Sequence, residues 1–205
     1  MLKLFYTPGT CALASRIALE DARAEYDIVR VDFSKQEQRS PEYLRINPKG
    51  RVPALSTDKG ILTETPAILV YIAQTFPEAE LAPLDDPFAF AEMQAFNTYI
   101  ASTVHVNHAH GRRGARWANE ESSFADMKAK VPETMLGAME LIEFGMLEGP
   151  WVMGERYTVA DPYLFTMSRW LEGDGVDIDR LPRIKDHLNR MSMLESVKRA
   201  LADMQ

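Results

Sequence analysis

Cys11, the only cysteine of the chain, is the residue best suited to thiol chemistry. It follows the turn sequence Pro8-Gly9-Thr10, where the spacing of apolar residues predicts that a helix begins with Thr10 as its cap. The N–H groups and the dipole at a helix N-terminus favour negative charge, so the position suits a thiolate. A buried structural cysteine is the alternative that position leaves open. A single cysteine excludes an internal disulfide and a multi-cysteine zinc site.

Two further segments have the chemistry to hold a peptide-like ligand. Val52 precedes Pro53, which restricts Val52 to an extended backbone that can pair with a peptide. Glu64-Thr65-Pro66 predicts a helix start with Thr65 as N-cap and Pro66 at the first helical position. Its carboxylate, hydroxyl and N–H groups can hold the ammonium and carboxylate of an amino acid. A plain strand start and an ordinary helix cap are the alternatives.

Three histidines lie close together on a predicted long helix. His105 and His108 are three residues apart and could face the same side, as a metal pair would, and His110 follows. No third ligand stands at a suitable spacing, so we expect no metal site. We expect His105 to act as a hydrogen-bonding residue instead.

The elements that must position these residues change in type along the chain. Strand patterns at residues 2–6, 26–33, 52–56 and 60–63 alternate with helical ones, and everything afterwards has helical patterns. A strand-helix-strand unit of this length predicts two parallel neighbouring strands. A proline-marked polar connector follows, so we predict an α/β domain at 1–78, a linker at 79–85 and an all-helical domain at 86–205.

The second half contains three local helix signals. Apolar residues recur at three- and four-residue spacing along one predicted helix face: Ala89, Met93, Phe96, Ile100 and Val104. Another helix is expected at about residues 124–144. Thr158 and Asp161 have the spacing of a capping box, and two short helices are expected from Pro182 onward.

Composition limits the class of protein. The 205 residues are 46% hydrophobic and 26% charged, which is typical of a soluble globular protein. The net charge of -7 disfavours nucleic acid binding. The sequence has no apolar run of membrane-spanning length and no signal-peptide pattern at its N-terminus, so we expect a cytoplasmic protein that does not bind membranes.

Taken together, four segments resemble motifs of the cytosolic glutathione transferases, most closely the bacterial beta class: residues 6–14, 47–55, 62–68 and 157–161. The resemblance spans both predicted domains. It implies a glutathione transferase fold, with a thioredoxin-like N-terminal domain (βαβ-ββα) and an all-helical C-terminal domain. It also implies a cis peptide bond before Pro53, a homodimer, and glutathione as co-substrate with no separate cofactor.

The resemblance also implies roles for individual residues. Cys11 is expected beside the glutathione sulfur, Val52 beside the cysteinyl backbone, and Glu64 and Thr65 at the γ-glutamyl end. Further residues expected near the ligand are Lys35, Pro53 and His105, of which His105 is catalytic together with Cys11. Two positions depart from the beta-class pattern: Ala12 stands where serine is frequent, and Val106 stands where many members have lysine.

Three functions follow from this pattern. The first is a transferase that conjugates the glutathione thiolate to a small, largely hydrophobic electrophile. The second is a glutathione-dependent thiol-disulfide reductase in which Cys11 is the nucleophile. The third is a non-catalytic binding module on the same fold, because a fold alone does not determine a function.

Overall fold

The chain folds into two compact units in a computed structural model that describes residues 1–202. The first unit is Met1–Ala91 with the segment that begins at Ser192, and the second is Glu92–Met191. The division into domains 1–78 and 86–205 stays a prediction. In the described part of the chain, no helix combines the length and the apolar character needed to span a membrane.

A four-stranded sheet forms the centre of the first unit, with the order β2-β1-β3-β4. The strands are β1 (Leu2–Tyr6), β2 (Tyr26–Arg30), β3 (Ala54–Thr57) and β4 (Gly60–Thr63). β1 and β2 are parallel, as the strand-helix-strand pattern predicts, and β3 and β4 form the expected antiparallel hairpin. The predicted bounds were wrong for two strands, because β2 ends at Arg30 instead of residue 33 and β3 starts two residues late.

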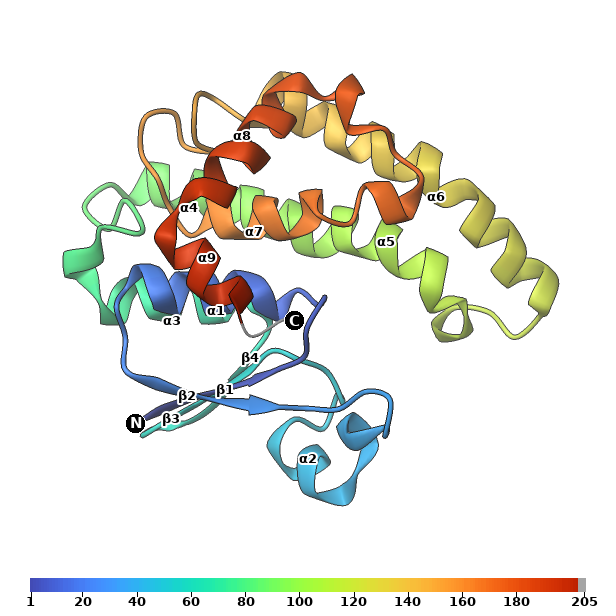
Figure 1. Ribbon diagram of the computed structural model, residues 1–205, viewed down its shortest axis with the longest axis horizontal. Coiled ribbons are helices and arrows are strands. Elements are labelled where there is room, and N and C mark those ends of the chain that lie inside the picture. Colours follow the sequence, from blue (N-terminus) through green and yellow to red (C-terminus); the bar gives the residue numbers. More distant parts are fainter. Residues whose placement is uncertain (203–205) are drawn as a thin grey trace. The chain divides into compact units, whose positions relative to one another are not determined.

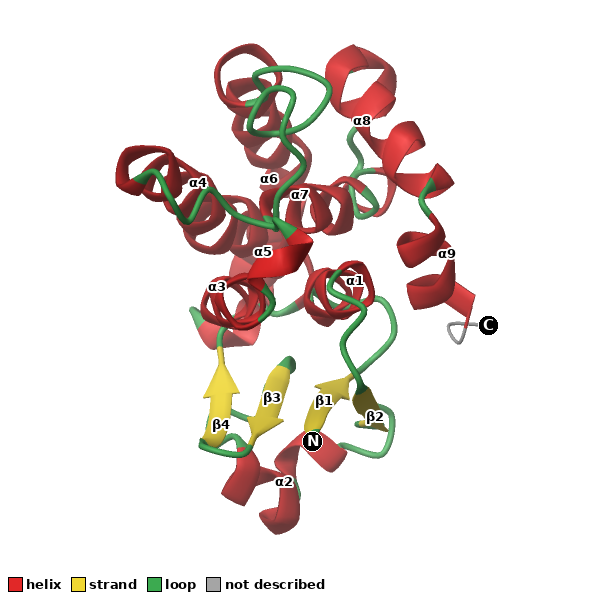
Figure 2. Ribbon diagram, turned by 90° about the vertical axis from the view of Figure 1, so that its left-hand side faces the viewer, coloured by secondary structure: helices red, strands yellow, loops and turns green. Residues whose placement is uncertain are grey.

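Helices cover both faces of this sheet (Figure 1). α1 (Ala12–Asp21) and α3 (Thr65–Thr75) lie on one side, and α2 (Pro41–Ile46) lies on the other. Every residue of α1 from Ala12 to Leu19 is buried, because the sheet, α3 and the last helix all pack around it. That last helix, α9 (Glu195–Ala202), lies beside α1 (Figure 2). Arg199 ties the two helices together, because its Nε lies 2.7 Å from the Glu20 carboxylate. The large side chains of this core include Leu4, Ile17, Leu55, Ile68, Leu69 and Ile72.

The second unit is helical, as predicted. A π-helical turn at Ile100–Val104 joins α4 (Pro87–Tyr99) to α5 (His105–Arg112). Another at Ile142–Met146 follows α6 (Glu121–Leu141). α7 (Ala160–Ser168) and α8 (Pro182–Met193) complete the set, and short 3-10 turns occur at Glu37–Arg39, Pro77–Ala79, Gly114–Arg116, Glu172–Asp174 and Ile178–Arg180. Met93, Phe96, Ile100 and Val104 are buried as the helical spacing predicts, whereas Ala89 is partly exposed.

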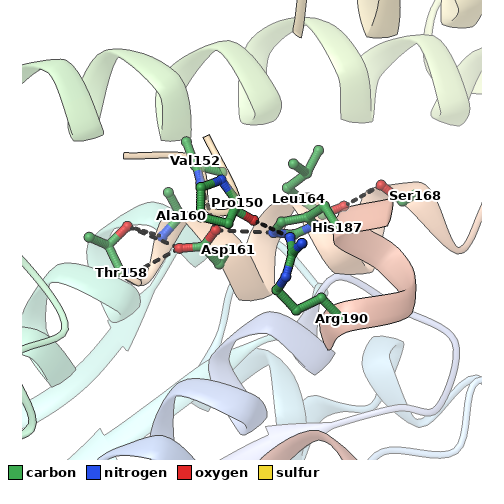
Figure 3. A network of polar contacts seen from close by, with 9 residues as sticks. All are labelled: Pro150, Val152, Thr158, Ala160, Asp161, Leu164, Ser168, His187 and Arg190. Carbon is green, nitrogen blue, oxygen red and sulfur yellow. Dashed lines mark hydrogen bonds and ion pairs between the residues drawn. The ribbon is translucent and has the colours of Figure 1, made fainter. Parts of the chain in front are cut away.

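The predicted contact of Asp161 back to Thr158 is confirmed and forms the centre of a buried polar network (Figure 3), but the N-cap of α7 is Val159, one residue after the predicted Thr158. The Asp161 carboxylate accepts hydrogen bonds from the Thr158 N–H at 2.7 Å and from the Val152 N–H at 2.8 Å. The Nε2 of His187 lies 3.0 Å from the same carboxylate. Asp161 is completely buried, so each of its partners replaces water that the carboxylate has lost.

Candidate functional site

The sheet topology brings the segments singled out in the sequence to one edge of the first unit. β1 and β2 end together, because Tyr6 pairs with Arg30. β3 begins and β4 ends at this same edge, because Ala54 pairs with both Phe5 and Thr63 (Figure 2). The loop after β1, the segment before β3 and the segment after β4 therefore meet there. In open α/β sheets, ligands bind outside the carboxyl ends of strands.

Cys11 lies at this edge as the residue immediately before α1. Its side chain is 7% exposed, and its Sγ donates to the Val52 carbonyl oxygen at 3.6 Å. The preceding loop is fixed by its hydroxyls, because Thr7 Oγ1 donates to the Val31 carbonyl and Thr10 Oγ1 donates to the Thr7 carbonyl. Thr10 Oγ1 also accepts from the Ala12 N–H at 3.4 Å, while Cys11 itself occupies the N-cap position. The predicted placement of the thiol at a helix N-terminus is confirmed, although the N-cap of α1 is Cys11, one residue after the predicted Thr10.

The Val52-Pro53 peptide bond is cis, as the family resemblance implies. The preceding residue, Arg51, is held through its carbonyl oxygen, which accepts from the Tyr43 hydroxyl and from Asn47 Nδ2, both at 2.7 Å. Burial raises the pKa of Tyr43 to about 12, so its hydroxyl remains a donor at neutral pH. Sequence reasoning missed both supporting residues.

Glu64 and Thr65 follow Thr63, the last residue of β4, which pairs with Ala54, the residue after Pro53. Glu64 adopts φ 72° and ψ 122°, which is uncommon for a residue with a side chain. Such backbone conformations occur preferentially at ligand-binding and catalytic positions. The prediction that Thr65 is the N-cap was wrong by one residue: α3 begins at Thr65, and Glu64 stands at the cap, where its carbonyl accepts from the Ile68 N–H. A positive φ cannot be read from a glutamate in a sequence.

The structure therefore brings together five of the predicted site residues, which we call the edge site: Cys11, Val52, Pro53, Glu64 and Thr65. Their groups can hold a thiol, an extended peptide backbone, an ammonium and a carboxylate close to one another. Lys49 also reaches the edge site, where its Nζ contacts Glu64. This contact could not be predicted from the sequence, because the two residues are 15 positions apart.

Lys35 and His105 have different surroundings. The Lys35 side chain is 73% exposed and lies 3.6 Å from Asp32, whose pKa is lowered by a hydrogen bond from the Ser34 hydroxyl. His105 belongs to the second unit, where its ring packs edge-on against Trp170 at 5.3 Å between centroids. His108 stacks on the same indole and pairs with Asp174 at 2.8 Å. Across residues 1–202, no cluster of three or more His, Cys, Asp or Glu side chains is arranged to bind a metal ion.

Comparisons with known proteins agree on one family. Residues 1–74 match the family described as Glutathione S-transferase, N-terminal domain. The chain is 32% identical to Glutathione S-transferase GstA of Escherichia coli over 204 residues, which cover 98% of both chains. It is 24% identical to Disulfide-bond oxidoreductase YfcG of Escherichia coli, over 98% of this chain and 94% of that protein.

Two solved structures give the same result. A glutathione transferase homologue from Sulfitobacter, with bound glutathione, is 50% identical at a TM-score of 0.96, covering 99% of this chain and 98% of that one. A beta class enzyme from Sphingomonas chungbukensis is 31% identical at a TM-score of 0.86, covering 98% of each chain.

Proposed function

This chain belongs to the glutathione S-transferase family, and from that premise we propose that it conjugates the glutathione thiolate to a small, largely hydrophobic electrophile. The observation that carries the proposal is the edge site. A thiol at a helix N-terminus lies within hydrogen-bond distance of the Val52 carbonyl, and a carboxylate and a hydroxyl follow the adjacent strand. A γ-glutamyl thiol peptide has a group for each of these: a thiol for the helix N-terminus, a peptide backbone for Val52, and an ammonium and a carboxylate for Glu64 and Thr65.

In this proposal each residue of the edge site binds a different part of glutathione. The helix N-terminus at Cys11 favours the negative charge of the glutathione sulfur. Val52 pairs its backbone with the cysteinyl part, next to Pro53. Glu64 accepts from the γ-glutamyl ammonium, and Thr65 donates to the γ-glutamyl carboxylate. Lys35 supplies a cation near the ligand, and His105 is the second catalytic residue of the proposal, together with Cys11.

The chemical step needs no group beyond these residues and the two substrates. The glutathione thiol loses its proton to solvent, and the sulfur lone pair forms a bond to the electrophilic carbon. The leaving group departs with the electron pair of its bond to that carbon. The protein accelerates this step by holding the sulfur as a thiolate in a fixed orientation.

We further propose a glutathione-binding domain at 1–78 and a helical domain at 86–205, a beta-class homodimer, and a cytoplasmic location. The sequence resemblance supports each of these. Light scattering on the purified protein measures the subunit number, and a monomer at micromolar concentration contradicts the dimer.

The first experiment is calorimetric titration of reduced glutathione, followed by conjugation assays with a panel of electrophiles and product identification by mass spectrometry. We expect micromolar to millimolar binding that Glu64→Gln weakens, and at least one thioether product. Absence of heat together with an unchanged melting temperature contradicts the whole proposal. Binding without any product contradicts the transferase reaction and favours a binding module.

A second candidate is thiol-disulfide reduction, which the position of the Cys11 thiol at the edge site favours. The Cys11 thiolate attacks the glutathione sulfur of a mixed disulfide, forming a Cys11–glutathione disulfide and releasing the other thiol as its thiolate. A second glutathione thiolate then attacks this disulfide, releasing oxidised glutathione and restoring Cys11. We expect Cys11→Ala to abolish reduction of a glutathione mixed disulfide and to keep its binding of glutathione, which shows that the site is intact. Unchanged reduction by the variant contradicts this mechanism.

A further inference from the structure

The Glu64 carboxylate at the edge site already holds an ammonium group, which comes from the chain itself. Lys49 Nζ donates to Glu64 Oε1 at 2.5 Å and to Thr63 Oγ1 at 2.6 Å. These two oxygens belong to consecutive residues at the end of β4. Together they make a subsite for a primary ammonium group, and Lys49 shows how such a group is bound.

The loop that carries Lys49 is fixed, although its side chain is accessible. The Lys49 N–H donates to Asn47 Oδ1 at 3.2 Å, and the Gly50 N–H donates to the Asn47 carbonyl at 2.9 Å. Gly50 has φ 59°, and a Cβ there would lie 2.8 Å from the Gln38 carbonyl oxygen, so this turn requires glycine. The side chains of Lys49 and Glu64 are 44% and 60% exposed, so another cation can replace Lys49 at low cost.

We propose that Lys49 is a specificity-determining residue that occupies the ammonium subsite of Glu64 until a ligand brings its own ammonium group. The inference rests on the proposed function and extends it to ligand selection. Glutathione displaces the Lys49 Nζ, because both cannot use the same carboxylate oxygen and hydroxyl. A ligand that has the carboxylate and lacks the ammonium leaves Lys49 in place, where it neutralises Glu64 beside the incoming negative charge.

The two ligand types therefore respond in opposite directions to loss of Lys49. For glutathione, Lys49→Ala removes a competitor, so we expect binding to tighten by about 1.5- to 5-fold, the strength of an exposed ion pair. For glutaryl-cysteinyl-glycine, which is glutathione without its amino group, the same variant leaves Glu64 uncompensated. We expect its binding to weaken by about the same factor. The preference for glutathione over this analogue then rises about 2- to 25-fold.

The experiment is calorimetric titration of both ligands into the wild-type protein and into Lys49→Ala. Lys59→Ala is the matched control. Lys59 is an exposed lysine in the turn between β3 and β4, and its removal changes the net charge by the same amount as the removal of Lys49. Glu64→Gln, with and without Lys49→Ala, completes a double-mutant cycle. We expect the preference for glutathione over the analogue to rise in Lys49→Ala and to stay unchanged in Lys59→Ala. When Glu64 is already replaced by Gln, we expect the additional Lys49→Ala change to leave this preference unaltered.

The outcomes separate the inference from the function on which it rests. If glutathione binds and its preference over the analogue is unchanged or falls in Lys49→Ala, the role of Lys49 is wrong and the proposed function stands. An equal rise in Lys59→Ala also overturns the inference, because general electrostatics then explains it. If the wild-type protein binds no glutathione, both proposals fail.

Discussion

Two carboxylates beside helix N-termini, Asp161 in the second unit and Glu64 in the first, show how the same chemical group serves two purposes. Asp161 is completely buried, and two backbone N–H groups and His187 surround its carboxylate (Figure 3). Glu64 is 60% exposed and holds one exposed lysine, on a backbone with positive φ. The hydrogen bonds of the Asp161 carboxylate are made by the protein itself, whereas the Glu64 carboxylate is accessible to a ligand. We therefore expect Asp161 to determine stability and Glu64 to determine binding.

Asp161→Ala is the most severe test of this comparison. Removal of the carboxylate leaves buried N–H donors without an acceptor, and we expect a loss of about 3 to 5 kcal/mol of unfolding free energy. Equilibrium denaturation by urea measures it. Asp126→Ala, an exposed aspartate on α6, is the control and should change stability by less than about 0.5 kcal/mol. A loss below about 1 kcal/mol for Asp161→Ala contradicts the stabilising role of the network.

Glu64→Ala tests the other half of the comparison. We expect glutathione affinity to fall about 10- to 100-fold, because a charged hydrogen bond to the ligand ammonium is lost. We expect the urea midpoint to stay close to that of the wild type, since the exposed pair with Lys49 contributes little. Calorimetry and denaturation on the same preparation measure both quantities. A variant that loses stability and keeps its affinity reverses the assignment of roles.

Asn47→Ala probes a residue with features of both regions. Asn47 is 1% exposed, and its amide donates to the Arg51 carbonyl and accepts from Lys49 N–H beneath the edge site. We expect a stability loss of about 1 to 3 kcal/mol and a loss of affinity smaller than that of Glu64→Ala. Parallel titration and denaturation check this ordering. Full affinity in a destabilised variant shows that the loop backbone is positioned without Asn47.

The parts of this structure that could be predicted from sequence depend on short-range patterns. The capping box at Thr158 and Asp161, the β3–β4 hairpin and the thiol before α1 each depend on residues within a few positions of one another. The N-cap at Glu64 could not be predicted, because the tertiary structure and not the residue type determines its positive φ. The supports of the edge site could not be predicted either, since Lys49 and Tyr43 reach their partners through the fold.

The pH dependence of stability gives the smallest and most specific test, at Tyr43. Its hydroxyl donates to the Arg51 carbonyl under the edge site, and burial raises its pKa from the ordinary 10 to about 12. Below pH 10 the phenol is protonated in the folded and unfolded states, so the hydrogen bond contributes fully. Between pH 10 and 12 the unfolded state loses the proton more readily, so the stability due to Tyr43 falls as pH rises.

Tyr43→Phe cannot ionise, so the comparison with the wild type isolates this effect and cancels the titration of Tyr26 and Tyr99, whose pKa values burial also raises. We expect the variant to be about 1 kcal/mol less stable at pH 8, because it lacks the hydrogen bond. The difference in unfolding free energy between the wild type and the variant should narrow between pH 10 and 11, because the wild type loses the stability due to Tyr43. A constant gap over that range means that the Tyr43 hydroxyl is as accessible in the folded protein as in the unfolded chain. In that case Tyr43 is to be grouped with the exposed Glu64, and Asn47 is the buried side chain that supports the Arg51 carbonyl under the edge site.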